Sequence, residues 1–299
     1  MKVNLLQTTG NGSFTEIKWD KPAHKSDEIE VRALMTGVCR SDLEMMQGNF
    51  GPLPLSMQGH EGLGVVIQVG ESIDGVKIGD YVATRGEPAY ADYYNCRLNE
   101  FVVVPEADPK YILEPVACGI NIVMQAYDAI KARSGDDKRC VILGSGFLAQ
   151  VAYKTIDLLN LNFKSVDVVG NYNKELWGHK LSDSVKGSYD VVIDLSSRTD
   201  VLDNIEYNNE ALLILGVQKK LESDFGNMLW KACTIVFPSP RADCFIEAMV
   251  YAEKWITNNS LVVDNFWTAG YNRSNEWQLA FEDGLNRPEN YNRGYIKWD

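Results

Sequence analysis

Residues 139–149 read RCVILGSGFLA, a short apolar run that leads into a glycine-rich turn and then a helix-like stretch. The turn fits the pattern G-x-G-x-x-G/A. In this pattern the first glycine permits a tight turn, the second lets a pyrophosphate approach the backbone, and the small last residue lets helix and strand pack closely. The helix start then offers free N–H groups to the phosphates. We therefore expect a nucleotide to contact Gly144, Gly146, Phe147 and Leu148, the alternative being a purely structural turn.

Further apolar runs follow this unit along the chain. Residues 165–169, 190–195 and 211–216 each have the length and composition of a buried strand, and helix-like segments lie among them. Strands that alternate with helices at this spacing predict an α/β domain with a parallel, doubly wound sheet.

The first third of the chain has a different character. In residues 28–35 apolar and polar side chains alternate, which is typical of a half-buried strand. Residues 62–84 contain short β-branched runs separated by glycines. Many short strands with tight turns predict a compact barrel-like or sandwich domain. The tail after about residue 261 is rich in aromatic residues, which we interpret as packing.

Bulk properties exclude several classes of function. The chain has 299 residues and a formal net charge of −12, without the basic stripe that nucleic-acid phosphates require. It contains no run of about 18 apolar residues, so we expect no membrane span. The first residues lack the features of a signal peptide, and the six cysteines include no CxxC pair. We therefore expect a cytoplasmic protein without a disulfide framework.

The end of the expected strand at residues 165–169, the second strand of the α/β domain, indicates which nicotinamide cofactor is used. Chains that bind NAD usually end this strand with Asp or Glu, which holds the ribose hydroxyls. Here residues 168–174 read VVGNYNK, with no carboxylate to repel a 2′-phosphate and with a lysine nearby. We therefore favour NADP(H) over NAD(H), with contacts from Gly170, Asn171 and Lys174. The alternative is that Asn171 bonds the ribose of NAD.

Three patches in the first 120 residues carry side chains that zinc prefers. Residues 36–42 (TGVCRSD) offer a thiolate, residues 59–62 (GHEG) an imidazole and a carboxylate, and residues 113–115 (LEP) another carboxylate. A catalytic zinc site uses three protein ligands and leaves one position open. Taken singly, each of these residues is also compatible with ordinary packing.

These motifs, in this order, resemble those of the zinc-containing medium-chain dehydrogenases and reductases, the superfamily of alcohol, sorbitol and glucose dehydrogenases. GVCRSD, GHEGLG, EPVACGI and the glycine-rich turn carry the resemblance, which spans nearly the whole chain. It implies a GroES-like catalytic domain, built from residues 1–122 and 262–299, around a Rossmann nucleotide-binding domain of residues 123–261.

The resemblance also implies one catalytic Zn²⁺ per chain. Cys39, His60 and Glu114 would be its ligands, with Glu61 as a mobile fourth ligand that exchanges with water or substrate.

Three consecutive residues receive further roles from the resemblance. Ser41 matches the hydroxyl that bonds the reacting oxygen and passes its proton on. Asp42 matches the carboxylate that orients the histidine ligand. Arg40 stands where some relatives use an arginine on the cofactor pyrophosphate.

Two departures from the family pattern limit what it implies. Many members carry a lobe with four cysteines that binds a structural zinc, whereas residues 83–99 contain only Cys96. We therefore expect a short form without that lobe. The histidine that relays the proton in alcohol dehydrogenases is Glu44 here, which leaves the proton route beyond Ser41 open.

The sequence thus predicts an enzyme that transfers hydride between a small alcohol or polyol, or the corresponding carbonyl, and a nicotinamide cofactor. One alternative is a zinc-free quinone or enoyl reductase on the same fold, and another is a non-catalytic nucleotide-binding sensor. The family implies a homodimer or homotetramer, and we expect neither nucleic-acid nor membrane partners.

Overall fold

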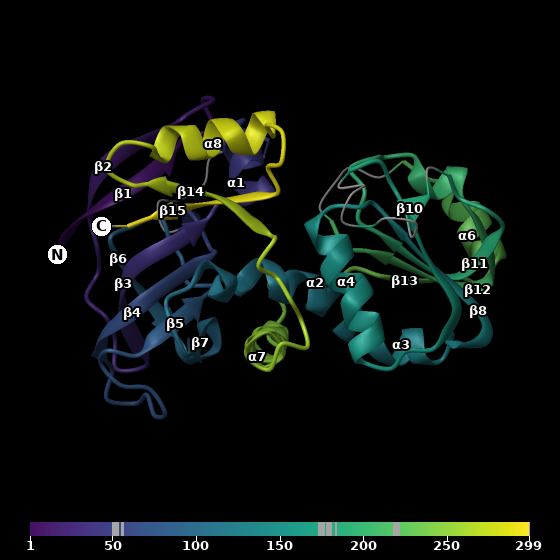
Figure 1. Cartoon of the computed structure of the whole chain (residues 1–299), viewed down its shortest axis with the longest axis horizontal. Helices are drawn as coiled ribbons and strands as arrows, with labels where there is room; N and C mark the ends of the chain where they lie inside the picture. The colour runs from purple at the N-terminus through teal and green to yellow at the C-terminus, as the bar shows by residue number, and fades with distance from the viewer. Residues whose placement is uncertain are drawn as a thin grey trace. The chain divides into compact units, whose positions relative to one another are not determined.

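The computed structural model describes residues 1–49, 54, 57–172, 177, 181–182, 184–217 and 222–298 (Figure 1). The chain divides into two compact units, one of Met1–Pro115 with Met249–Asp299 and the other of Val116–Ala248. The boundaries lie after Pro115 and Ala248, earlier in the chain than the boundaries expected from the sequence after residues 122 and 261. No helix of the described residues is long and apolar enough to cross a membrane.

The unit Val116–Ala248 is built on a parallel sheet whose described strands run in the order β10-β9-β8-β11-β12-β13. The predicted parallel sheet is confirmed. Its strands are β8 (Gly135–Leu143), β9 (Phe163–Val169), β10 (Leu181–Ser182), β11 (Ser188–Asp194), β12 (Glu206–Leu215) and β13 (Thr234–Val236). Its helices include α3 (Tyr127–Lys131), α4 (Phe147–Leu158), η5 (Val201–Asn204) and α6 (Phe225–Trp230), while α2 (Glu114–Met124) and α7 (Phe245–Thr257) cross the unit boundaries.

Strand β8 shows why its apolar run folds this way. Cys140 and Ile142 enter one hydrophobic cluster, and Val141 and Leu143 enter another. Because successive side chains of a strand point to opposite faces, the sheet has a core on each face. A continuous apolar run is what such a doubly covered strand requires.

The other unit contains a mainly antiparallel sheet, in the order β14-β15-β3-β4-β5-β7, with β6 also paired to β3. The strands of this sheet are β3 (Glu28–Gly37), β4 (Gly62–Val69), β5 (Tyr81–Thr84), β6 (Tyr93–Arg97), β7 (Phe101–Val104), β14 (Trp267–Asn272) and β15 (Arg293–Lys297). Two further strands, β1 (Lys2–Thr8) and β2 (Phe14–Asp20), pair with each other in a separate antiparallel sheet. The helices of this unit include α1 (Arg40–Met46), η2 (Leu98–Glu100), η3 (Pro109–Tyr111) and α8 (Trp277–Asn286). Strands from both ends of the chain therefore meet in one sheet (Figure 1).

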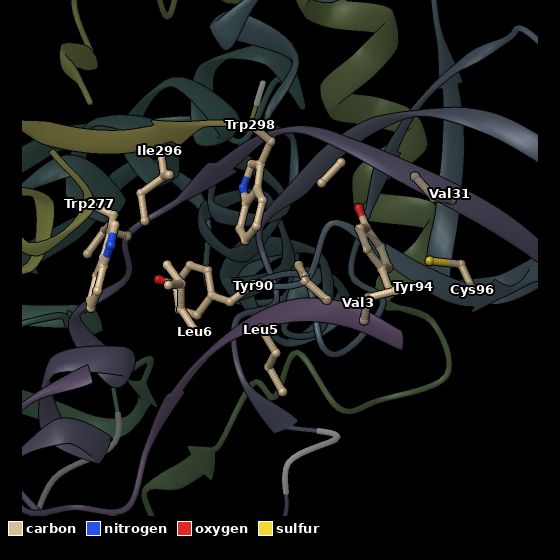
Figure 2. Close-up of a cluster of buried hydrophobic side chains, with 14 of the residues drawn as sticks. Val3, Leu5, Leu6, Val31, Tyr90, Tyr94, Cys96, Trp277, Ile296 and Trp298 are labelled. Carbon is tan, nitrogen blue, oxygen red and sulfur yellow. The ribbon is translucent and has the colours of Figure 1, made fainter. Parts of the chain in front are cut away.

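Aromatic side chains form much of the core of this unit. Tyr90, Tyr94 and Trp298 are buried among aliphatic residues such as Leu5 (Figure 2). The aromatic tail supplies Trp298 and Trp277 to this cluster, which fits the interpretation that these residues serve packing.

The expectation that residues 28–35 form a half-buried strand is wrong in one respect. The strand exists, but Glu28 and Glu30 are buried instead of facing solvent. Along this stretch β3 is an inner strand, with β4 on one side and β6 on the other. Lys21, itself buried, compensates one of the charges, with its Nζ 3.3 Å from Glu30 Oε1.

Candidate metal and cofactor sites

The candidate metal ligands lie where β3 ends and β4 begins. Cys39 precedes helix α1 directly, and Glu61 directly precedes β4. The two strands are antiparallel neighbours, and the Gly37 amide donates to the Glu61 carbonyl at 2.9 Å. As a result, ligand atoms of Cys39, His60 and Glu61 all lie within 4.8 Å of one another.

Two glycines allow this close approach. A Cβ on Gly37 would lie 2.1 Å from Glu61 Oε2, so the Glu61 side chain would have to move. Gly59 has a φ of +75°, and a Cβ there would lie 2.6 Å from the ring of Tyr90. The glycines in GVC and GHEG are therefore required by packing next to the ligands.

Asp42 links the segment that carries Cys39 to the segment that carries His60. Its Oδ2 accepts hydrogen bonds from the Cys39 amide and from the Tyr90 hydroxyl, each at 2.8 Å. Its buried Oδ1 has no hydrogen-bond partner in the described part of the chain and lies 3.7 Å from His60 Nδ1. Since the Nδ1 side faces Asp42, Nε2 is the nitrogen left for a metal.

The electrostatics of this cluster favour a cation. Burial alone would lower the pKa of His60, but the carboxylates of Asp42 and Glu114, together with Cys39, raise it well above its ordinary value. Burial and Asp42 raise the pKa of Tyr90, which keeps its hydroxyl protonated as a donor. A thiol, an imidazole and carboxylates with a buried, unsatisfied oxygen beside them fit a zinc ion by donor chemistry.

Glu61 is also bound by a residue that the sequence motifs do not reveal. Its side chain is fully buried, and both of its carboxylate oxygens lie 2.5 Å from Arg293 Nη2. The Arg293 guanidinium lies 5.2 Å from the centre of the Trp267 ring. Arg293 is on β15, which pairs with β3, so the contact follows from the sheet order and has no local signal in the sequence.

Glu114 lies outside the close group. It starts α2 and is 2% exposed, and its carboxylate acts on His60 electrostatically.

Arg40 and Ser41 form the start of α1, with Arg40 exposed and Ser41 half-buried. Arg40 Nη2 lies 2.6 Å from Glu44 Oε1, so the expected cofactor arginine is paired with the residue at the proton-relay position.

The glycine-rich turn connects β8 to α4 in the other unit. Gly144 has a φ of +108°, and a Cβ there would lie 2.9 Å from the Leu195 carbonyl oxygen. Gly146 is the N-cap of α4, and a Cβ on it would meet nothing within 4 Å. The turn therefore leaves open space at a helix N-terminus, as phosphate binding requires. Phe147 is buried and Leu148 half-buried, so both contribute side chains to packing and only backbone to the turn.

The end of β9 is attached to this turn. Ser145 Oγ donates to the Tyr172 carbonyl at 2.6 Å and accepts from the Tyr172 amide at 2.9 Å. Gly170 lies against Ser145, because a Cβ on it would be 2.5 Å from Ser145 Oγ. Asn171 is exposed at this end. Lys174 lies outside the described residues.

The family match lies within the first part of the chain. Residues 25–110 match the alcohol dehydrogenase GroES-like domain. An alcohol dehydrogenase of Moraxella sp. is 26% identical over 199 residues, which cover 56% of this chain and 58% of that relative. D-arabinitol dehydrogenase 1 of Uromyces fabae is 23% identical, covering 80% of this chain and 83% of the relative.

Similarity to solved structures extends over the whole chain. The structure of an alcohol dehydrogenase from Thermus sp. ATN1 covers 100% of each chain with a TM-score of 0.77, at 14% sequence identity. At this identity the likeness shows the fold alone. The GroES-like match and the relatives show a likeness to alcohol and polyol dehydrogenases, and the solved structure shows the same fold.

Proposed function

We propose that this chain is a zinc-dependent oxidoreductase that transfers hydride between a small alcohol or polyol and NADP(H). The observation that carries the proposal is the group of Cys39, His60 and Glu61, whose ligand atoms lie within 4.8 Å of one another. The buried Asp42 behind His60 adds the outer partner that histidine ligands of metals usually have.

When bound, zinc would polarise the substrate oxygen and the nicotinamide would exchange the hydride. The chain's own residues would hold and orient these groups. Cys39 would bind the metal through Sγ and His60 through Nε2, while Asp42 holds the Nδ1 side of the ring. Glu61 would serve as an exchangeable ligand that Arg293 holds when it is not bound to the metal.

Glu114 remains a proposed ligand of the same ion. It is buried, and its carboxylate contributes to the negative potential around His60. In that role it would offset the positive charge of the ion whether or not it coordinates directly.

Ser41 would accept the proton of the substrate hydroxyl, as the family resemblance implies. It is half-buried in the first turn of α1, next to Asp42. Glu44, one turn further along α1, forms an ion pair with Arg40. It could receive a proton only after that ion pair opens.

The cofactor would bind with its pyrophosphate at the N-terminus of α4. Gly144 and Gly146 support this, because neither carries a side chain and the space beside Gly146 is open. The absence of a carboxylate at Gly170 and Asn171 supports NADP(H), and an Asn171 contact with the ribose of NAD is the alternative.

The arabinitol dehydrogenase among the relatives supports a sugar alcohol as substrate. A panel of linear alcohols, pentitols and hexitols, and their phosphates tests this, with NADP⁺ and NAD⁺ each as acceptor. Turnover that a chelator abolishes and zinc restores is the expected result. Turnover that survives complete removal of metal would point to the zinc-free reductase, and no turnover in either direction to the nucleotide sensor.

A further inference from the structure

Tyr90 contacts both segments that carry the candidate metal ligands. Its hydroxyl donates to Asp42 Oδ2 at 2.8 Å and lies 3.2 Å from the Gly37 carbonyl oxygen. Its ring lies against Gly59, where a Cβ would be only 2.6 Å away. One residue therefore touches the segment that carries Cys39 and the segment that carries His60.

Two hydrogen bonds hold the backbone of Tyr90, and a third holds the residue before it. Its amide donates to the Gln58 carbonyl at 3.0 Å, and its own carbonyl accepts from the Leu6 amide at 2.9 Å. The neighbouring Ala89 amide donates to the Gly59 carbonyl at 3.0 Å. The ring is fully buried in the core shown in Figure 2, in edge-on contact with Phe14 and Phe281. This rigidity makes Tyr90 suited to hold another group in place.

The hydroxyl of Tyr90 distinguishes the two oxygens of Asp42. Oδ2 accepts from both Tyr90 and the Cys39 amide, whereas the buried Oδ1 has no hydrogen-bond partner in the described part of the chain. Oδ1 is the oxygen nearest to His60 Nδ1, at 3.7 Å. With both donors on Oδ2, rotation of the carboxylate would break two hydrogen bonds. Oδ1 is thereby kept toward His60.

We propose that Tyr90 is a positioning residue of the metal site, acting through Asp42 on the orientation of His60. This inference rests on the proposed function, since it assumes that His60 binds zinc through Nε2. Neither the family motifs nor the spacing of the ligands singles out Tyr90, which lies in the loop between β5 and β6.

The test compares Tyr90→Phe with the matched control Tyr94→Phe. Both tyrosines are fully buried in one core, but the Tyr94 hydroxyl bonds Thr84 Oγ1 at 2.9 Å and not Asp42. The dissociation constant for zinc is measured by competition with a chromophoric chelator, and the thermal midpoint of each metal-free protein is recorded. We expect Tyr90→Phe to weaken zinc binding about tenfold, as changes around histidine ligands typically do. Tyr94→Phe should lower the thermal midpoint about as much as Tyr90→Phe does, but it should leave zinc binding unchanged.

Equal zinc affinity in the two variants would overturn the proposal while leaving the proposed function intact. If the unaltered protein binds no zinc, the proposed function and this inference both fail. Should Tyr90→Phe not fold, Asp42→Asn provides the second test. The two donors that face Oδ2 would then bind the amide oxygen of Asn and turn its nitrogen toward His60. Zinc affinity should therefore fall by more than tenfold. An affinity equal to that of the unaltered protein would refute the proposal that Tyr90 acts through Asp42 on His60.

Discussion

Arg293 Nη2 lies 2.5 Å from both carboxylate oxygens of Glu61, although 232 positions separate the two residues in the sequence. Glu61 is fully buried and belongs to the candidate metal group. The same carboxylate therefore lies beside a guanidinium and also belongs to the group proposed to hold a metal ion. This competition leads to the first prediction.

Replacing Arg293 with methionine should destabilise the metal-free protein by about 3 kcal/mol, because it leaves a buried carboxylate without its partner. Zinc should restore much of this loss by supplying the missing positive charge. The rise in melting temperature on adding zinc is thus expected to be larger in Arg293→Met than in the unaltered protein.

Arg273→Met is the matched control for this change. Arg273 lies over the Trp298 ring at 5.3 Å, much as Arg293 lies over Trp267, and it pairs with Glu16 instead of a candidate ligand. The rise in melting temperature on adding zinc should be the same in Arg273→Met as in the unaltered protein. An equally small shift in both variants would show that Glu61 does not exchange between arginine and metal.

Loss of the thiol at Cys39 should remove zinc and turnover together. Cys39→Ser replaces the only sulfur in the metal group, whereas Cys244→Ser changes an exposed cysteine in the other unit and should affect neither property. Metal content and turnover of each purified variant provide the measurement. A metal-free Cys39→Ser protein that retains turnover would defeat the proposed mechanism.

The stabilisation by zinc should grow as the pH rises. Buried His60 has a pKa raised well above 6.5 by Asp42, Glu114 and Cys39, against the effect of burial. In the metal-free protein, protonated His60 adds stability that is fully present below about pH 6.5, the ordinary pKa, and is lost as the pH rises through the folded value.

Zinc must displace that proton, so its apparent affinity should fall about tenfold for each pH unit below the folded pKa, per proton displaced. Calorimetric zinc titrations between pH 5.5 and 8 check this, within about the range where histidine titrates. A zinc affinity independent of pH would mean that His60 is not a ligand.

A carboxylate at the end of β9 should shift the proposed preference for NADP(H) toward NAD(H). Asn171 is exposed next to Gly170, at the turn that Ser145 ties to the glycine-rich loop. Asn171→Asp would repel a 2′-phosphate and offer an acceptor to ribose hydroxyls, so NADPH binding should weaken by about tenfold relative to NADH. Fluorescence titrations with both cofactors measure this ratio. An unchanged ratio would favour the interpretation that Asn171 already contacts the ribose of NAD.

Local patterns were sufficient to predict the sheet of the Val116–Ala248 unit. The run that ends at Leu143 and the glycines that follow it combine hydrophobicity, turn geometry and helix start within about ten residues, so no distant contact is needed. The proximity of Cys39 and His60 came from the family resemblance, because spacing alone does not show that β3 and β4 are neighbours.

Contacts that depend on the sheet order could not be predicted in this way. Arg293 reaches Glu61 because β15 pairs with β3. Glu30 is buried on an inner strand, where β6 is a neighbour of β3 and Lys21 pairs with the carboxylate. No motif in the sequence marks Tyr90, and its hydroxyl gains a role only when Asp42 is placed beside it. For Glu61 and for Tyr90 the partner is distant in the sequence, 232 and 48 positions away.

The metal content of the purified protein, with parallel titrations of NADPH and NADH, tests the central claim most directly. The account predicts about one zinc per chain and tighter binding of NADPH. Cofactor binding without zinc, even after zinc is offered, would contradict it and favour the zinc-free reductase.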